Sequence, residues 1–152
     1  MKIKTANIIQ WRDLFIIIDD GSVPVDEYQR IETIVRSQAQ RNPDGLGCLV
    51  IIPKGAQPPP TEVRKYLDGM LDRLPMRCLA YLVEGTGFRS AAVRAALVGM
   101  RVFLRKSYST KVSSSLDEAI VWLLNHLGDK DARKADIPTA RQAVLDGRSA
   151  AA

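Results

Sequence analysis

The stretch EGTGFRS, residues 84 to 90, is the part of the chain whose residue types and spacing come closest to a chemical site. It follows the apolar run CLAYLV and opens a helical pattern, so its two glycines lie where a strand turns into a helix. Backbone N–H groups and the helix dipole can bind a phosphate or another anion at such a turn. The candidate anion or ligand contacts are Lys54, Thr86, Gly87 and Arg89.

The spacing within this stretch does not match a known phosphate loop. The pattern GxxxxGK[ST] is absent, and Ser90 occupies the position of the third glycine in GxGxxG. Glu84 also places a negative charge at the end of the strand, where it would oppose a bound phosphate unless it pairs with Arg89. The sequence therefore favours a structural corner and leaves anion binding as the alternative.

The remaining ionisable groups have structural interpretations. Asp19-Asp20 follows a strand, where aspartate favours a turn, and Asp117-Glu118 lies in the first turn of a helix, where the dipole favours negative charge. The one histidine, His126, lies in the last turn of a helix, and the sequence shows no nucleophile or further metal ligand converging on it. We therefore predict no catalytic residue, no metal site and no cofactor, and a protein that is not an enzyme.

Composition indicates one soluble globular domain with a tail. Of the 152 residues, 46% are hydrophobic and 26% are charged, which is the balance of a folded domain. The net charge of +5 is not gathered in a basic block, and aromatic residues are 6% of the chain, so we expect protein partners and not nucleic acid. Cys48 and Cys78 each lie in an apolar run and are predicted to be buried free thiols.

The chain shows no targeting or membrane segment. No apolar run approaches the roughly 20 residues that span a bilayer. Residues 1 to 7 lack the charged start, apolar middle and cleavage site of a secretory signal. We therefore expect a cytoplasmic protein without a transmembrane segment.

The order of patterns predicts an α/β fold, β-β-α-β-α-β-α-β-α, with a mostly parallel sheet, an N-terminal antiparallel hairpin and helices packed against it. The apolar run at 45–53 is typical of a central strand buried on both faces. Thr61 is a plausible N-cap for the second helix, and Ser115 with Glu118 forms a capping box for the last one, which Gly128 closes. The predicted segments are strands within 3–11 and 14–18, a helix from about 24 to 42, a strand at 45–53, a helix at 61–74, a strand at 78–83, a helix at about 88–104, an outer strand at 109–115 and a helix at 115–128.

The sequence divides into a domain at residues 1–128 and a mixed-charge linker and tail at 129–152. The tail segment IPTARQAVLDGR could form one short helix, with apolar residues on one side. Such a helix is too short to be stable alone, so it would have to dock on the domain or on a partner.

The helix that follows EGTGFRS carries more apolar surface than one sheet face requires. Ser90, Arg94, Arg101 and Arg105 share one narrow stripe. Ala91, Ala95 and Gly99 form a line of small residues that would allow a close approach to the sheet. The additional apolar surface of this helix favours packing against neighbouring helices or an interface with a second protein. The candidate interface residues are Arg94, Leu97, Met100, Arg101 and Leu104.

The order of the strand patterns, the ending DEAIVWL at 117–123 and the corner EGTGFRSAAVRAAL resemble a STAS-like domain, the fold of bacterial anti-sigma-factor antagonists. More narrowly, the chain resembles bacterial STAS-like proteins without assigned function, which carry a W-x-x-x-hydrophobic start, a PPP-type loop, EGTGFR and a closing DEA-x-x-WL. The resemblance covers about residues 3 to 128. The resemblance implies a compact module without catalytic activity that binds partner proteins.

The resemblance also implies where a regulatory phosphate would lie. The antagonists carry a D-S-[ST]-G serine at the start of the helix after the third strand, and the corresponding stretch here is PKGAQPPPTEV. It has no such serine, and Thr61 is the one hydroxyl at the right end, which makes it a weak candidate phosphosite. A scaffolding or oligomerisation role is therefore favoured over a phosphorylation switch.

Two hypotheses remain from the sequence. The first is a cytoplasmic STAS-like protein-interaction module with a regulatory or scaffolding role, which associates with itself or with another protein. The second is a small-molecule or anion-binding protein with a site at the carboxyl ends of the strands, near Thr86 to Arg89.

Overall fold

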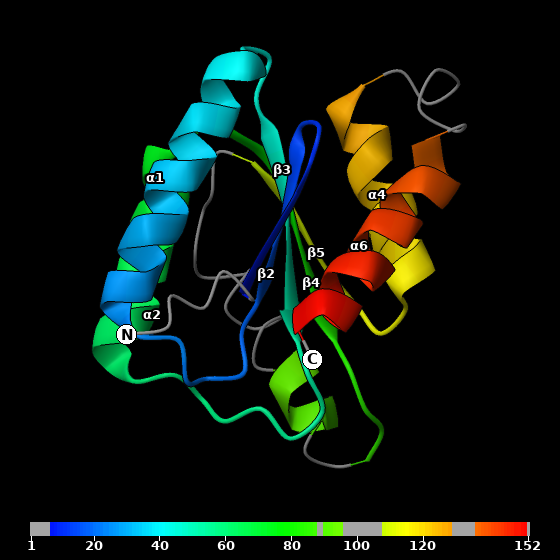
Figure 1. Cartoon of the computed structure of the whole chain (residues 1–152). Helices are drawn as coiled ribbons and strands as arrows, with labels where there is room; N and C mark the ends of the chain where they lie inside the picture. Colours follow the sequence, from blue (N-terminus) through cyan, green and yellow to red (C-terminus); the bar gives the residue numbers. More distant parts are fainter. Residues whose placement is uncertain (1–6, 88–89, 96–107, 129–135, 152) are drawn as a thin grey trace.

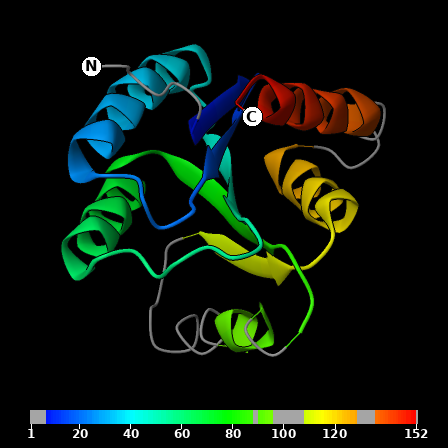
Figure 2. The same ribbon diagram turned by 60° about the horizontal axis from the view of Figure 1, so that its bottom comes forward.

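The computed structural model describes residues 7–87, 90–95, 108–128 and 136–151, and they form three layers (Figure 1). The middle layer is a five-stranded mixed sheet in the order β1-β2-β3-β4-β5, in which β1 is antiparallel to β2 and the other neighbours are parallel. Figures 1 and 2 show α1 and α2 on one face of the sheet and α4 and α6 on the other. The strands are β1 (Ile8–Trp11), β2 (Leu14–Ile18), β3 (Leu46–Ile52), β4 (Met76–Val83) and β5 (Ser109–Ser113).

The strands agree with the sequence patterns. The predicted hairpin is confirmed, because β1 and β2 pair in register from Ile8 with Ile17 to Trp11 with Leu14. The continuous apolar run forms β3, which is central and buried over Leu46–Ile51. Alternation along β3 sends Cys48 to the α1 and α2 side and Leu49 to the α4 and α6 side, so each face of the sheet has its own apolar cluster. Both cysteines are free and buried, as predicted.

The sequence predicted the N-cap residues of two helices, one correctly and one not. The helices on the two faces of the sheet are α1 (Val25–Arg41), α2 (Thr61–Arg73), α4 (Leu116–Leu127) and α6 (Ile137–Ala151). The capping box is confirmed, since the Ser115 side chain accepts a hydrogen bond from the Glu118 N–H at 3.3 Å. The prediction that Thr61 is an N-cap is wrong: Pro60 holds that position without a side-chain cap, and Thr61 is the first helical residue. The Pro60 carbonyl accepts the first hydrogen bonds of the helix, from the Val63 and Arg64 N–H groups at 3.0 Å, which is what a residue at the N-cap does.

The helical segment at 90–95 lies on the β5 side of the sheet in Figure 2, and its orientation differs from the prediction. Ala91 and Ala95, expected against the sheet, are exposed. Ser90 and Arg94 instead point back to the end of β4, where backbone carbonyls at a strand end need donors. The residues predicted to continue this helix to 104 lie outside the described residues.

The tail contributes a helix of 15 residues, α6, to the same core as the rest of the chain. Ala140 and Val144 are fully buried in the cluster that α4 forms with the sheet. Docking on the domain was one of the two arrangements that the sequence left open for this segment. Because the contact is with α4 and β1, α6 completes the layer over that face.

Candidate functional site

The glycine corner after β4 is held by hydrogen bonds to the strand end. Gly85 and Gly87 have φ angles of 92° and 101°, which a residue with a side chain rarely adopts. The Ser90 hydroxyl donates to the Glu84 carbonyl at 3.2 Å, and the Arg94 guanidinium donates to the Val83 carbonyl at 3.3 Å. The Ser90 hydroxyl and the Arg94 guanidinium therefore bind the backbone at the end of β4.

The Glu84 carboxylate pairs with an arginine that the sequence patterns did not indicate. Arg148 of α6 donates from Nη2 to Oε1 at 2.5 Å and from Nη1 to Oε2 at 2.8 Å. The two side chains are 29% and 30% exposed, so the pair is partly shielded from water. Hydrogen bonding to Glu84 raises the pKa of Arg148, and this outweighs the lowering by burial. Arg89, the partner that the sequence suggested, lies outside the described residues.

The structure brings together some of the predicted anion contacts. A Cβ placed on Gly85 would lie 3.1 Å from Cγ of Lys54, so the lysine stem packs against the glycine corner. Lys54, Thr86 and Gly87 are all exposed. One lysine, Lys54, therefore lies beside the glycine corner, which also carries the Glu84 carboxylate that pairs with Arg148.

A second group of loops meets at the carboxyl ends of β2 and β3. The Asp19 carboxylate accepts a hydrogen bond from the Gly21 N–H at 3.0 Å, and Asp20 accepts from Ser22, which confirms the predicted turn. Burial raises the pKa of Asp19, and the Gly21 hydrogen bond partly offsets this. An open pocket of about 550 Å³ lies beside the turn, between the first turns of α1 and α2. Asp26 and Glu62 line it, and their charges make it unsuited to an anion.

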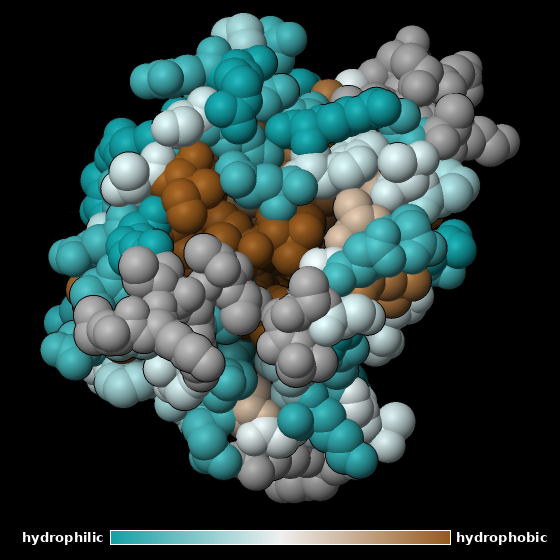
Figure 3. Space-filling model, viewed as in Figure 1, coloured by the Kyte–Doolittle hydropathy of each residue, from teal (hydrophilic) through white to brown (hydrophobic). Residues whose placement is uncertain are grey.

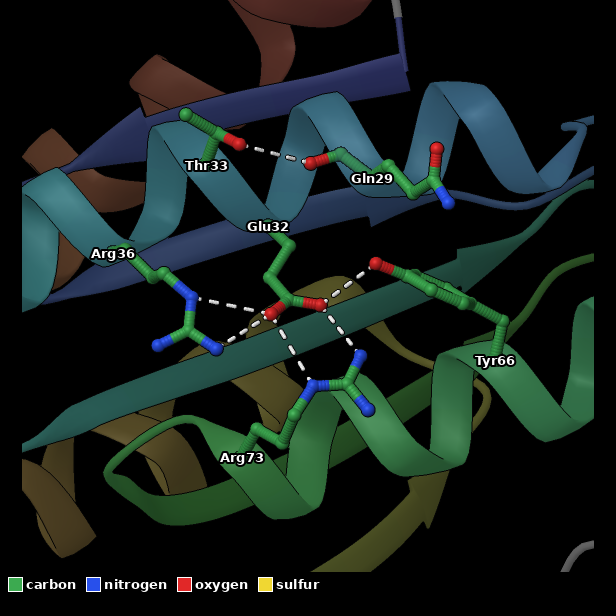
Figure 4. A network of polar contacts seen from close by, with 6 residues as sticks. All are labelled: Gln29, Glu32, Thr33, Arg36, Tyr66 and Arg73. Carbon is green, nitrogen blue, oxygen red and sulfur yellow. Dashed lines mark hydrogen bonds and ion pairs between the residues drawn. The ribbon is translucent and has the colours of Figure 1, made fainter.

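A charge cluster around one buried carboxylate lies between α1 and α2 (Figure 4). The Glu32 carboxylate is 10% exposed and binds two guanidiniums, from Arg36 at 2.7 Å and from Arg73 at 2.6 Å. The Tyr66 hydroxyl donates to it at 2.8 Å. Hydrogen bonding to Arg73, ahead of the opposing effect of burial, lowers the pKa of Glu32 to about 2. The cluster ties the two helices together, and the spacing of Glu32 and Arg36 was its one signal in the sequence.

His126, the one histidine of the chain, lies in a helix and contacts that helix. His126 Nδ1 lies 2.8 Å from the Trp122 carbonyl, and its ring contacts the Trp122 ring at a tilt of 36°, with centroids 4.1 Å apart. In the part of the chain that the structure describes, no group of three or more His, Cys, Asp or Glu residues could hold a metal ion. None of the helices within those same ranges is long and apolar enough to cross a membrane.

Comparisons with models of known protein families, with curated proteins and with solved structures found no match. The candidate site therefore rests on the geometry of this chain alone.

The most apolar surface in view lies between α1 and α6, over the β1-β2 hairpin (Figure 3). Within the described residues, β1 pairs with β2 on one side and forms the edge of the sheet on the other. Ile8 is partly buried against the α1 and α2 cluster, and Ile9 and Trp11 are partly buried against the α4 and α6 cluster. We call this surface the β1 edge. Of the interface residues suggested by the sequence, Arg94 binds the end of β4, and Leu97, Met100, Arg101 and Leu104 lie outside the described residues.

Proposed function

We propose that the chain is a cytoplasmic, non-catalytic protein-interaction module of the STAS-like type that associates with a second copy of itself and has a scaffolding or regulatory role. The observation that carries the proposal is the β1 edge, where half-buried apolar side chains flank a strand that is the last one of the sheet within the described residues. Exposed strand edges and apolar surface are the two features that favour association with another chain.

Two further observations support the STAS-like part of the proposal. The strands follow one another across the sheet in sequence order, with only the first one antiparallel. The EGTGFR stretch carries much of the sequence resemblance, and its described part, residues 84–87, forms the corner that follows β4. The expected role of that corner is to position the helix after it.

Anion binding near Thr86 stays as the second candidate function. It is supported by Lys54, whose stem lies against Gly85 beside the exposed Thr86 and Gly87. It is opposed by the Glu84 carboxylate at the same strand end, which would repel a phosphate.

Light scattering tests self-association directly. We expect the wild-type chain to give a mass near twice 16.8 kDa at tens of micromolar, and Ile8→Lys to give a monomer, since a charge on an edge strand opposes edge-to-edge pairing. Val121→Lys is the matched control, because Val121 is an apolar residue 37% exposed on α4, which packs on β3, β4 and β5 and not at the β1 edge. Circular dichroism checks that each variant is folded. A folded wild-type chain that stays monomeric at every concentration would refute the self-association.

A further inference from the structure

The helix α6 is held in place by small apolar contacts. Ala140 and Val144 are fully buried and Ile137 is partly buried against the same cluster, whereas Leu145 is 43% exposed. By contrast, α4 buries three leucines, an isoleucine and an alanine in the same cluster. The hydrophobic effect scales with the apolar area that is buried, so α6 is attached to the core much more weakly than α4.

Ion pairs add to the attachment of α6. Within the described residues, three of them join the helix and the residue before it to the β1-β2 turn, to α4 and to the end of β4. Asp136 pairs with Arg12 in the β1-β2 turn at 2.8 Å, and Arg141 pairs with Asp117 of α4 at 2.7 Å. Arg148 pairs with Glu84 at the end of β4 through two hydrogen bonds and is the most shielded of the three. These pairs fix both the position and the direction of the helix.

The surface beneath α6 is shaped for a helix with small residues on one side. A Cβ on Gly147 would lie 2.6 Å from Cδ1 and from Cγ1 of Ile9, so α6 approaches β1 where it has no side chain. Ala140, Val144 and Gly147 follow one another at intervals of four and three residues and therefore share one face of the helix. We call the surface that receives this face the α6 groove; its contacts come from Ile9, Glu84, Asp117 and Arg12.

We propose that the α6 groove binds a helix in trans, and that its occupant is the α6 of a second copy of this chain. The proposal rests on the self-association proposed above and names the element that is exchanged. The α6 of a second copy, with the residue before it, has the same face of small residues and the same three charged side chains. Each contact that α6 makes with its own chain can therefore also form between α6 of one chain and the groove of another. A helix of 15 residues is marginal in water, and a released α6 therefore gains by binding whichever groove is open. Because α6 lies next to β1, the exchange would take place beside the β1 edge.

A pair of charge-reversed full-length chains tests the exchange. One chain carries Glu84→Arg and the other carries Arg148→Glu, so each has like charges between its own α6 and its own groove. Juxtaposed like charges should weaken docking within each chain at least about tenfold. In an equimolar mixture, both mismatches are resolved when the two chains exchange α6. We expect a heterodimer near twice 16.8 kDa in the mixture, at concentrations where each variant alone is monomeric.

The double variant Glu84→Arg with Arg148→Glu is the matched control, because its charges are again opposite within one chain. It should show the same monomer and dimer populations as the wild-type chain, and adding either single variant should not increase the dimer, because each exchange would then leave one like-charged pair. If a single variant does not fold alone, the two are unfolded together in urea and refolded by dilution, and the heterodimer is sought in the product. A mixture of folded single variants that stays monomeric would refute the exchange.

A peptide of residues 136–152 gives a second measurement that does not depend on dimer formation. It should bind the full-length Arg148→Glu chain at least about tenfold more tightly than the Glu84→Arg chain, as fluorescence anisotropy would show. Equal affinity for both chains would contradict the groove. A wild-type chain that is monomeric by light scattering, together with a heterodimer from the variant pair, would refute the proposed self-association of the native protein and leave the α6 groove supported.

Discussion

Substitution of Glu32 by alanine is expected to lower the free energy of unfolding by about 2 to 3 kcal/mol, which urea denaturation would measure. The reason is that two guanidiniums and one hydroxyl lose their shared acceptor between α1 and α2. Removing one partner from a buried ion pair costs about 3 to 5 kcal/mol in general. The value here is smaller because the side chains of Arg36 and Arg73 are 53% and 44% exposed and so remain partly solvated.

The matched control is Gln29→Ala, since Gln29 is exposed on the same helix and is drawn beside the cluster in Figure 4. A surface substitution of this kind should change the free energy of unfolding by less than about 0.5 kcal/mol. Equal losses for the two variants would mean that the Glu32 cluster contributes nothing beyond helix propensity.

The same carboxylate gives the stability a defined dependence on pH. The pKa of Glu32 is about 2 in the folded chain, against an ordinary value of 4.5 in the unfolded chain. A lowered pKa means that the contribution of Glu32 is fully present above about pH 4.5 and is lost as the pH falls toward about 2. The difference in unfolding free energy between wild type and Glu32→Gln should therefore shrink between about pH 6 and about pH 3. A constant difference over that interval would show that the charge of Glu32 is not what stabilises the helix pair.

Much of the fold follows from the sequence because its signals are local. Apolar runs bounded by glycine and proline located β3 and β4, and the serine-glutamate capping box located the start of α4. The sequence predicted a central strand at 45–53 and an outer strand at 109–115, and the sheet has β3 in the middle and β5 at one end. The buried thiols were predictable for the same reason, since each cysteine lies inside an apolar strand.

The contacts that depend on residues far apart in the sequence could not be predicted. Glu32 and Arg73 are 41 positions apart, and Glu84 and Arg148 are 64 apart, so no spacing rule connects either pair. The orientation of the segment at 90–95 was also missed, because the helical wheel does not show that the end of β4 has carbonyls in need of donors. In both cases, the ion pairs and the segment at 90–95, the sequence did not show which group a polar side chain binds. Those partners come together only when elements that are distant in the sequence pack against one another.

The turn after β2 should be the least tolerant glycine position in the described chain, with Gly21→Ala expected to lower the free energy of unfolding by about 3 kcal/mol or more. A Cβ on Gly21 would overlap the backbone carbonyl of Gln57, and the φ angle is 88°. The neighbouring backbone cannot easily move away, because the Gln57 N–H donates to the Asp20 carbonyl at 3.0 Å and ties the two loops together.

Gly55→Ala separates the two causes of that loss. Gly55 has a similar φ angle of 82°, but a Cβ placed there would have nothing within 4 Å. Alanine at this position therefore meets only the conformational penalty of about 1 kcal/mol. The difference of about 2 kcal/mol between the variants then measures the contact between the loops after β2 and β3. Hydrogen exchange at the Gln57 N–H should be faster in Gly21→Ala and unchanged in Gly55→Ala. If both variants lower the free energy of unfolding by the same amount, the loops after β2 and β3 can move apart to accept the added Cβ. The carboxyl end of the sheet would then not be the rigid corner from which α1 and α2 start.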